Sequence, residues 1–153
     1  MLVSMTRWLD PDEQRTWRAY LAASRALMDT LDRELQRDAG MPHAYYEILV
    51  RLSEAPDRRL RMGDLADATG SSRSRLSHAA ARLEASGWIR REDCPTDRRG
   101  QVAALTDAGY AALAAAAPGH VEGVRRHLFD ALSPAQVDQL RRISETLADH
   151  LTG

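Results

Sequence analysis

The segment from Ser71 to Thr106 constrains the fold most, because its pattern changes from helical to strand-like within a few residues. Its first half, SSRSRLSHAAARLEAS, has apolar residues at helical spacing between Leu76 and Leu83 and ends before Gly87. Its second half has two strand-like runs, WIRRE and QVAALT, around the turn formers of DCPTDRRG. The sequence therefore predicts a short helix followed by a β-hairpin whose tip, Pro95 to Gly100, carries arginines outward.

The charge of this segment differs from that of the whole chain. The net charge of the 153 residues is −1, whereas residues 71–91 contain five arginines and one acidic residue, Glu84. A local excess of this kind favours contact with a polyanion. All 21 basic residues are arginine, whose guanidinium group pairs well with phosphates and guanine edges. GC-rich coding also explains the lack of lysine, and we give that explanation more weight.

Two shorter helices precede this segment. The apolar pattern predicts one helix at about Pro42–Ser53 and another at about Met62–Thr69, which ends at Gly70. The helix of residues 71–86 follows Gly70 at once. A short helix, a tight turn and a second helix form a helix-turn-helix, whose second helix lies in the major groove of DNA.

Long helices are predicted at both ends of the chain. One runs from about residue 10 to 38, and two more occupy residues 107–151, capped by Thr106 and Ser133 and interrupted or kinked at Pro118. A winged helix-turn-helix buries its own core within about 70–90 residues, so the apolar stripes of these helices need another cover. A second copy of the chain would supply it, and a dimer would present two recognition helices to a two-fold DNA site.

Composition and motifs argue against several other classes of protein. The length indicates a single domain, and the one cysteine, Cys94, excludes an internal disulfide framework. No run is apolar enough to span a membrane and the N-terminal region is acidic, so we expect a cytoplasmic protein. The five histidines are scattered, so neither a metal site nor a cofactor is expected. No GxSxG, P-loop, GxGxxG or HExxH motif is present, which argues against an enzyme.

Two runs, LADATGSSRSRLSHAAARLEASGWIRRE and DRRGQVAALTDAG, resemble the MarR (multiple antibiotic resistance regulator) family of winged helix-turn-helix transcription factors. Asp97, Arg99, Leu105, Thr106 and Gly109 stand where the wing signature of that family has Asp, Arg, Leu, Thr and Gly. The order of the predicted helices matches the family along essentially the whole chain.

The resemblance implies a mainly α fold with a small β-hairpin wing, built as one MarR-type domain over residues 1–153. Its winged helix-turn-helix lobe would occupy about residues 42–106, and its dimerisation helices about residues 10–38 and 107–151. It also implies a homodimer on a palindromic operator in double-stranded DNA, acting as a repressor that a small aromatic or phenolic ligand releases. The alternatives are a thiol-based redox regulator acting through Cys94 and a winged-helix module that binds protein, which would have an apolar recognition helix.

The second helix of the helix-turn-helix carries most of the DNA contacts that the resemblance implies. Arg75 can pair with both acceptors of a guanine, and serines at the helix start can cap the helix or donate to phosphates. A solvated face explains Arg82 equally well, and Ser77 is better explained as a surface residue. The candidates on this helix are Ser71, Ser72, Arg73, Ser74, Arg75, Ser77, His78 and Arg82, of which Arg73, Arg75 and His78 are expected to read base edges.

The wing supplies the remaining expected contacts. Arg99 is expected to enter the minor groove, where the negative potential is strong, with Asp97 holding it in position. Arg98 is expected to meet phosphate.

Aromatic residues concentrate in the first two predicted helices, near the place where the family keeps its ligand cleft. We therefore consider a ligand site formed by Trp17, Tyr20, His43, Tyr46 and Arg51. Packing in the core or at a dimer interface explains each aromatic residue better when it is taken singly.

Cys94 stands beside the expected wing tip. It follows Asp93, whose carboxylate is expected to raise the pKa of the thiol. We therefore interpret this cysteine as incidental.

Overall fold

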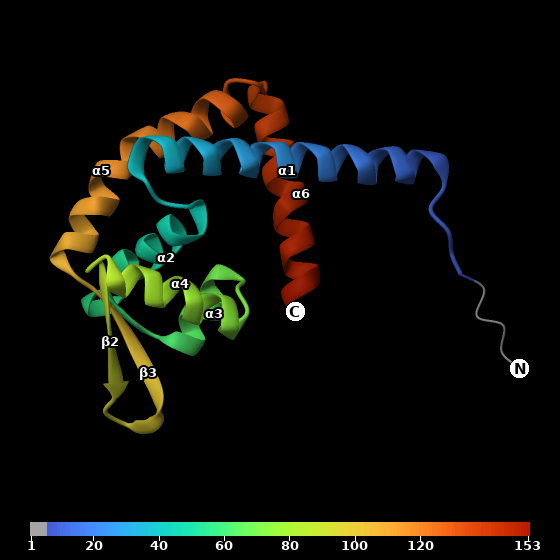
Figure 1. The fold of residues 1–153 in the computed structure, drawn as a ribbon. Helices are drawn as coiled ribbons and strands as arrows, with labels where there is room; N and C mark the ends of the chain where they lie inside the picture. Colours follow the sequence, from blue (N-terminus) through green and yellow to red (C-terminus); the bar gives the residue numbers. More distant parts are fainter. Residues whose placement is uncertain (1–5) are drawn as a thin grey trace, which may run out of the picture.

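A computed structural model of the chain describes residues 6–153, apart from the side chain of Arg98. Its elements follow in the order α1 (Pro11–Ala39), α2 (His43–Glu54), a 3-10 turn η1 (Pro56–Arg58), β1 (Arg59–Arg61), α3 (Met62–Thr69), α4 (Arg73–Ala85), β2 (Ile89–Cys94), β3 (Asp97–Leu105), α5 (Asp107–Val124), a π-helical turn η2 (Arg125–Phe129) and α6 (Pro134–Thr152). Figure 1 shows α2, α3, α4 and the hairpin gathered in one lobe below α1 and α5. The expected fold class, mainly α with a small sheet and a winged helix-turn-helix, is confirmed.

The sheet contains one strand that the sequence did not predict. Its order is β1-β3-β2, with both pairs antiparallel, and β1 places Leu60 opposite Ala103. A strand of three residues has too few positions to show an alternating pattern. The expected wing tip was also too long: β3 begins at Asp97, which leaves only Pro95 and Thr96 between the strands. The reason is that cross-strand pairing, which turn propensity alone does not reveal, extends to Cys94 and Asp97.

The core of the lobe lies between α2, α3, α4 and the sheet. Leucines from each of the three helices are fully buried there, together with Ile89 of β2. Gly70 connects α3 to α4 with a φ of 61°, a left-handed conformation that glycine adopts without a steric penalty. Local backbone freedom and a shared core therefore fix the angle between the two helices. The fully buried leucines are Leu49, Leu52, Leu65, Leu76 and Leu83.

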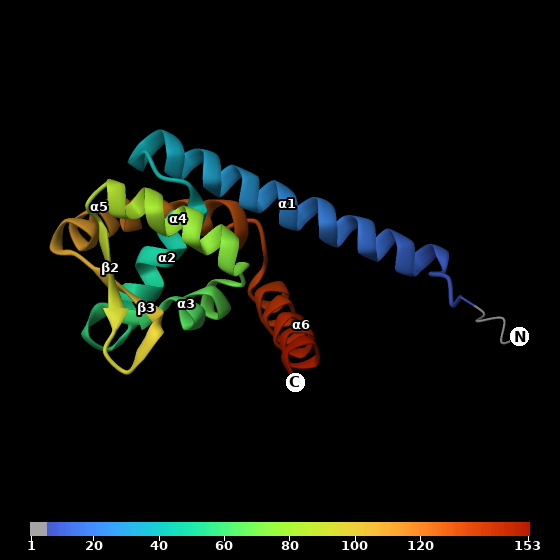
Figure 2. The ribbon, with the colours of Figure 1, turned by 60° about the horizontal axis from the view of Figure 1, so that its bottom comes forward.

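The first helix is long because both of its ends are well capped. Asp10 and Glu13 form a capping box at its start, and Gly40, with a φ of 65°, ends it. Only Leu31 and Leu35, in its last third, are buried. That third packs against α5, while the rest extends beyond the lobe (Figure 2).

The fifth helix continues through Pro118, so of the two expectations at that residue, an interruption or a kink, the interruption is wrong. A proline inside a helix removes one backbone hydrogen bond, but the ring at this position is exposed and its neighbours are small alanines. The irregularity comes instead at η2, where the backbone widens into a π turn before α6 begins. A capping box between Ser133 and Gln136 starts α6, in which no residue is buried.

Candidate nucleic-acid interface

Helix α4 presents two different faces. Leu76, Ala80 and Leu83 point into the core, and this burial orients the helix on the lobe. Ser72 caps the helix, because its hydroxyl accepts a hydrogen bond from the backbone N–H of Arg75 at 3.2 Å. The other predicted contacts on α4 lie on the exposed side. These exposed residues are Arg73, Ser74, Arg75, Ser77, His78 and Arg82.

The wing residues Asp97 and Arg99 are linked through the backbone. The Oδ1 atom of Asp97 accepts a hydrogen bond from the N–H of Arg99 at 3.0 Å. Among the described contacts, the Asp97 carboxylate forms no ion pair with the guanidinium of Arg99. Asp97 thus fixes the backbone at Arg99 and leaves the guanidinium exposed. The side chain of Arg98 lies outside the part of the chain that the structure describes.

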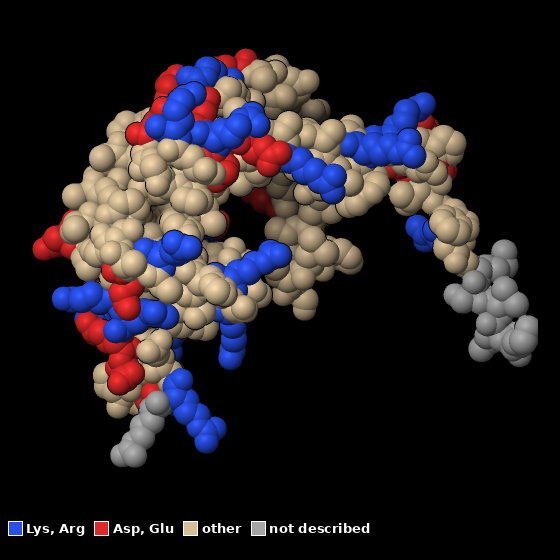
Figure 3. Space-filling view, in the orientation of Figure 1, with Lys and Arg blue, Asp and Glu red and all other residues tan. Residues whose placement is uncertain are grey.

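A cleft of about 520 Å³ separates α4 from the wing. Three arginines from different elements line it: Arg61 at the end of β1, Arg73 at the start of α4 and Arg99 on β3. Figure 3 shows arginine side chains projecting from the part of the surface around the hairpin. The sequence reasoning missed Arg61, because only the unpredicted strand β1 brings this residue beside the wing.

Two arginines next to α4 have structural partners. Arg91 is partly buried, and both its backbone N–H and its Nε contact the Oε2 of Glu84, at 2.9 and 3.3 Å. These bonds from Arg91 lower the pKa of Glu84. Arg90 lies 3.8 Å from the carboxylate of Glu92. Arg91 therefore joins the wing to α4, whereas Arg82 remains an exposed side chain.

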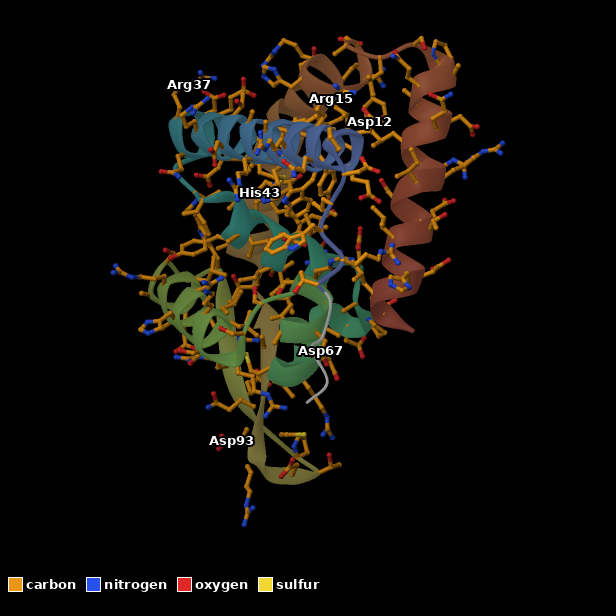
Figure 4. All side chains as sticks on the ribbon, turned by 90° about the vertical axis from the view of Figure 1, so that its right-hand side faces the viewer. Asp12, Arg15, Arg37, His43, Asp67 and Asp93 are labelled. Atoms are coloured by element: carbon orange, nitrogen blue, oxygen red, sulfur yellow. The ribbon has the colours of Figure 1, made fainter. Side chains whose placement is uncertain are left out.

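Three of the five residues expected at a ligand site line one pocket of about 340 Å³: His43, Tyr46 and Arg51. The ring of His120 from α5 completes it, with centroids 4.5 Å from Tyr46 and 5.4 Å from His43. Figure 4 shows His43 at the start of α2, between that helix and α1. No local pattern in the sequence indicated His120, because α5 approaches α2 only in the folded chain.

The pocket residues are partly shielded from water. Burial lowers the pKa of His120 and raises the pKa of Tyr46, so both side chains favour their neutral forms. The Nδ1 atom of His120 is buried and has no hydrogen-bond partner among the described residues.

The remaining two aromatic candidates do not line this pocket. Trp17 and Tyr20 stack on each other with ring centroids 6.3 Å apart, and about half of each side chain is exposed. Both residues belong to the first half of α1, and Figure 2 shows that this end of the helix extends beyond the lobe. Within one chain, Trp17 and Tyr20 therefore do not line the pocket of His43, and their part in a ligand site stays a prediction.

The expectation that the pKa of Cys94 is raised is also wrong. Hydrogen bonding to Thr96, whose Oγ1 lies 3.4 Å from the sulfur, lowers it, and the nearby charge of Arg61 acts in the same direction. The neighbouring carboxylate of Asp93 does not decide the shift, because successive residues of a strand point to opposite faces. The thiol is nevertheless buried.

No helix in residues 6–153 is long and apolar enough to cross a membrane. Over the same residues, no three or more His, Cys, Asp or Glu side chains form a group that could hold a metal ion.

Comparison with known proteins identifies relatives along the chain. Residues 39–100 match the model of the MarR family. The transcriptional repressor MprA of Escherichia coli K12 is 30% identical over 112 residues, which cover 73% of this chain and 63% of the repressor. The chain thus spans slightly less than two thirds of that curated relative.

Two solved structures from Streptomyces coelicolor are more similar. Sco3205, a MarR family transcriptional regulator crystallised in complex with DNA, is 56% identical, with a TM-score of 0.92 over 97% of this chain and 93% of the other. AbsC, also a MarR family transcriptional regulator, is 45% identical, with a TM-score of 0.88 over 95% of this chain and 98% of the other. Both are regulators, which agrees with the exclusion of an enzyme. At this identity and coverage, the chain belongs to the MarR family of transcriptional regulators.

Proposed function

We propose that this protein is a sequence-specific regulator that binds double-stranded DNA through α4 and the wing. The observation that carries the proposal is the cleft in which Arg61, Arg73 and Arg99 converge from three elements. A helix with an exposed polar face fits the major groove, and a guanidinium on a hairpin fits the minor groove. The DNA complex of Sco3205, at 56% identity, supports this assignment. A DNA-binding role also implies a location with the chromosome, in the cytoplasm.

Some of the proposed contacts read base edges, and the others position the protein on the DNA backbone and in the minor groove. Arg73, Arg75 and His78 are proposed to read base edges, because all three are exposed on the outer side of α4. Arg99 is proposed to enter the minor groove and Arg98 to meet phosphate. The remaining proposed contacts are Ser71, Ser72, Ser74, Ser77, Arg82 and Asp97.

The same proposal includes a homodimer on a palindromic operator. Single chains leave large apolar side chains of α6 and of the first half of α1 exposed, among them Trp17, Ile143 and Leu147. A second copy would bury them, as an isologous interface joins identical surfaces. In this arrangement residues 42–106 form the DNA-binding lobe, and residues 10–38 and 107–151 form the dimerisation part. The naming of MprA as a repressor supports repression as the direction of control.

A small aromatic or phenolic effector is the second part of the proposal. The pocket of His43, Tyr46, Arg51 and His120 lies where α2 meets α5, between the lobe and the long helices. An occupant there would alter how the two parts meet, and Arg51 could pair with an anionic group. Protection of the purified protein against thermal unfolding by salicylate, and loss of that protection in His120→Ala, would be the expected results. An equal shift in both proteins would contradict this pocket.

DNA binding is tested by measuring affinity for the upstream region of the protein's own gene at rising salt concentrations. We expect binding that weakens steeply with salt, because Lys and Arg side chains displace counterions from phosphate. Arg99→Ala is expected to weaken binding strongly, whereas Arg15→Ala, which changes an exposed arginine on the extended part of α1, is expected to leave it unchanged. Failure to bind either this DNA or random duplex would refute the central proposal.

A further inference from the structure

Strand β1 is short, yet both of its arginines reach across the neighbouring strand. Arg59 and Arg61 are opposite Ala104 and Val102 of β3, so they share one face of the sheet. The guanidinium of Arg59 pairs with Glu92 of β2, and the Nη2 of Arg61 donates a hydrogen bond to the Oγ1 of Thr96 at 2.8 Å. Both contacts therefore connect the edge strand to the far half of the hairpin.

Thr96 occupies a position from which it can control the wing. It is one of only two residues between β2 and β3, and Asp97, which follows it, accepts the hydrogen bond from the N–H of Arg99. The Oγ1 of Thr96 also lies 3.4 Å from the sulfur of the buried Cys94. A continuous series of contacts thus runs from Arg61 through the turn to the backbone of Arg99.

Such contacts have a physical consequence for binding. Two strands joined by a tight turn are only marginally stable and twist easily when nothing else holds them. A group that is already fixed in its bound direction loses less conformational freedom on association and so binds more tightly. A bond from β1, which leads directly into α3, couples the direction of the hairpin tip to the helix-turn-helix.

We propose that Arg61 and Thr96 are positioning residues, which hold the wing turn so that Arg99 meets DNA in a fixed direction relative to α4. The inference rests on the proposed binding of DNA. It assigns to Thr96, an uncharged residue outside the expected contact set, a measurable part in that binding. It also gives Arg61 a role beyond its charge in the cleft.

The decisive variant is Thr96→Val, which removes the acceptor with little change in shape and no change in charge. We expect affinity for operator DNA to fall about three- to tenfold, which is the size of effect that loss of one exposed side-chain hydrogen bond has. The dependence of binding on salt should stay unchanged, because a lost phosphate contact would reduce its slope by about 0.9. Thr96→Ser should restore affinity, since it keeps the hydroxyl. A reduced salt slope in Thr96→Val would overturn the inference.

Two further variants identify the partners. In an Arg99→Ala background, Thr96→Val should cause no additional loss, because the residue that it positions is absent. Cys94→Ala removes the sulfur contact but keeps the bond from Arg61, and it should bind DNA as the unchanged protein does. Fully additive losses in the double variant would contradict the positioning of Arg99 by Thr96. A Cys94→Ala variant that binds DNA as weakly as Thr96→Val would contradict the role of Arg61.

Hydrogen exchange of the free protein gives a measurement that does not require DNA. Amides of residues 97–101 should exchange faster in Thr96→Val and in Arg61→Ala than in the unchanged protein, while those of α4 stay the same. Unaltered exchange in both variants would refute the positioning role. If the unchanged protein bound no DNA while exchange responded as expected, the proposed function would fail and the structural part of the inference would stand.

Discussion

The lobe and the long terminal helices have similar apolar periodicity, but the lobe buries its apolar side chains whereas α6 leaves them exposed. Leu49, Leu65 and Leu83 of the lobe have no exposed surface, whereas Ile143 and Leu147 of α6 are 59% and 45% exposed. Burial of a leucine side chain contributes about 2 kcal/mol, so the lobe obtains its stability from its own residues and α6 does not. The difference shows which part of the chain buries its own apolar side chains and which part leaves them exposed.

Helix α1 contains both behaviours in one element. Leu31 and Leu35 are 4% and 3% exposed against α5, whereas Trp17 and Tyr20, several turns earlier, are 51% and 55% exposed. The helix is regular throughout, because capping and local propensity do not depend on burial. Its first half is therefore helical even though its aromatic side chains are exposed.

The strongest test of this comparison targets the uncovered stripe of α6. Ile143→Asp combined with Leu147→Asp should leave the lobe folded but abolish dimers. The reason is that burial of a carboxylate in an interface is costly when no opposite charge pairs with it. Light scattering should then report monomers, and DNA affinity should fall about a hundredfold or more, as two linked half-site contacts become one. Thr146→Asp, away from the stripe, is the control. A double variant that remained dimeric would show that α6 does not form the interface.

The second test compares two leucines of equal size. Leu49→Ala should destabilise the lobe by about 2–5 kcal/mol, because it opens a cavity in a closed core. Leu140→Ala, at a 39% exposed position of α6, should cost much less within one chain. Denaturant unfolding at several protein concentrations distinguishes loss of core packing from loss of an interface, since only the stability that an interface contributes depends on protein concentration. Equal losses at all concentrations would remove the distinction between the regions.

The third test concerns the junction where the lobe meets α5. A Cβ atom at Gly109 would overlap the carbonyl oxygen of Trp88 and lie 2.8 Å from the Cδ1 of Leu105, so Gly109→Ala should cost about 1–3 kcal/mol. Gly119→Ala, ten residues further along the same helix, meets nothing within 4 Å and should stabilise it by about 0.5–1 kcal/mol. Thermal unfolding should show a lower midpoint temperature for Gly109→Ala and a higher one for Gly119→Ala than for the unchanged protein. A stable Gly109→Ala variant would mean that α5 can move away from the hairpin without cost.

The smallest change in stability is expected when the contacts that join α1 to η2 are removed. A hydrogen bond from His127 at 2.8 Å, followed by one from Arg126, lowers the pKa of Glu34 from its ordinary value of 4.5. A depressed pKa contributes stability above the unfolded value, and this contribution is lost as the pH falls below 4.5 through the lowered pKa. Unfolding measured across that range should show a shallower pH dependence in Glu34→Gln. An identical dependence in both proteins would contradict a role for this ion pair.

Much of the fold could be predicted because its signals are local. Gly40 and Gly70 end their helices with left-handed backbone, and Thr106 and Ser133 cap the helices that follow them, as their positions in the sequence indicate. The outward face of α4 also follows from helical spacing alone. Whether each of its exposed residues contacts DNA remains a prediction.

The rest depended on contacts between distant residues. Arg61 lies 35 residues before Thr96, and His120 lies 77 residues after His43, so no local pattern connects either pair. The passage of α5 through Pro118 likewise contradicts the local rule for proline. A long helix that packs against α1 tolerates one lost backbone hydrogen bond when the proline ring faces outward.

The helices, their ends, the polar face of α4 and the resemblance to a family are all readable from the sequence, since each depends on residues close together in the chain. Tertiary structure decided which apolar stripes are covered and which arginines converge. It also determined that the Asp97 carboxylate binds the backbone rather than the guanidinium of Arg99. The physical reason is that burial and hydrogen bonding between elements depend on how the chain is folded in space, which periodicity along the chain does not specify.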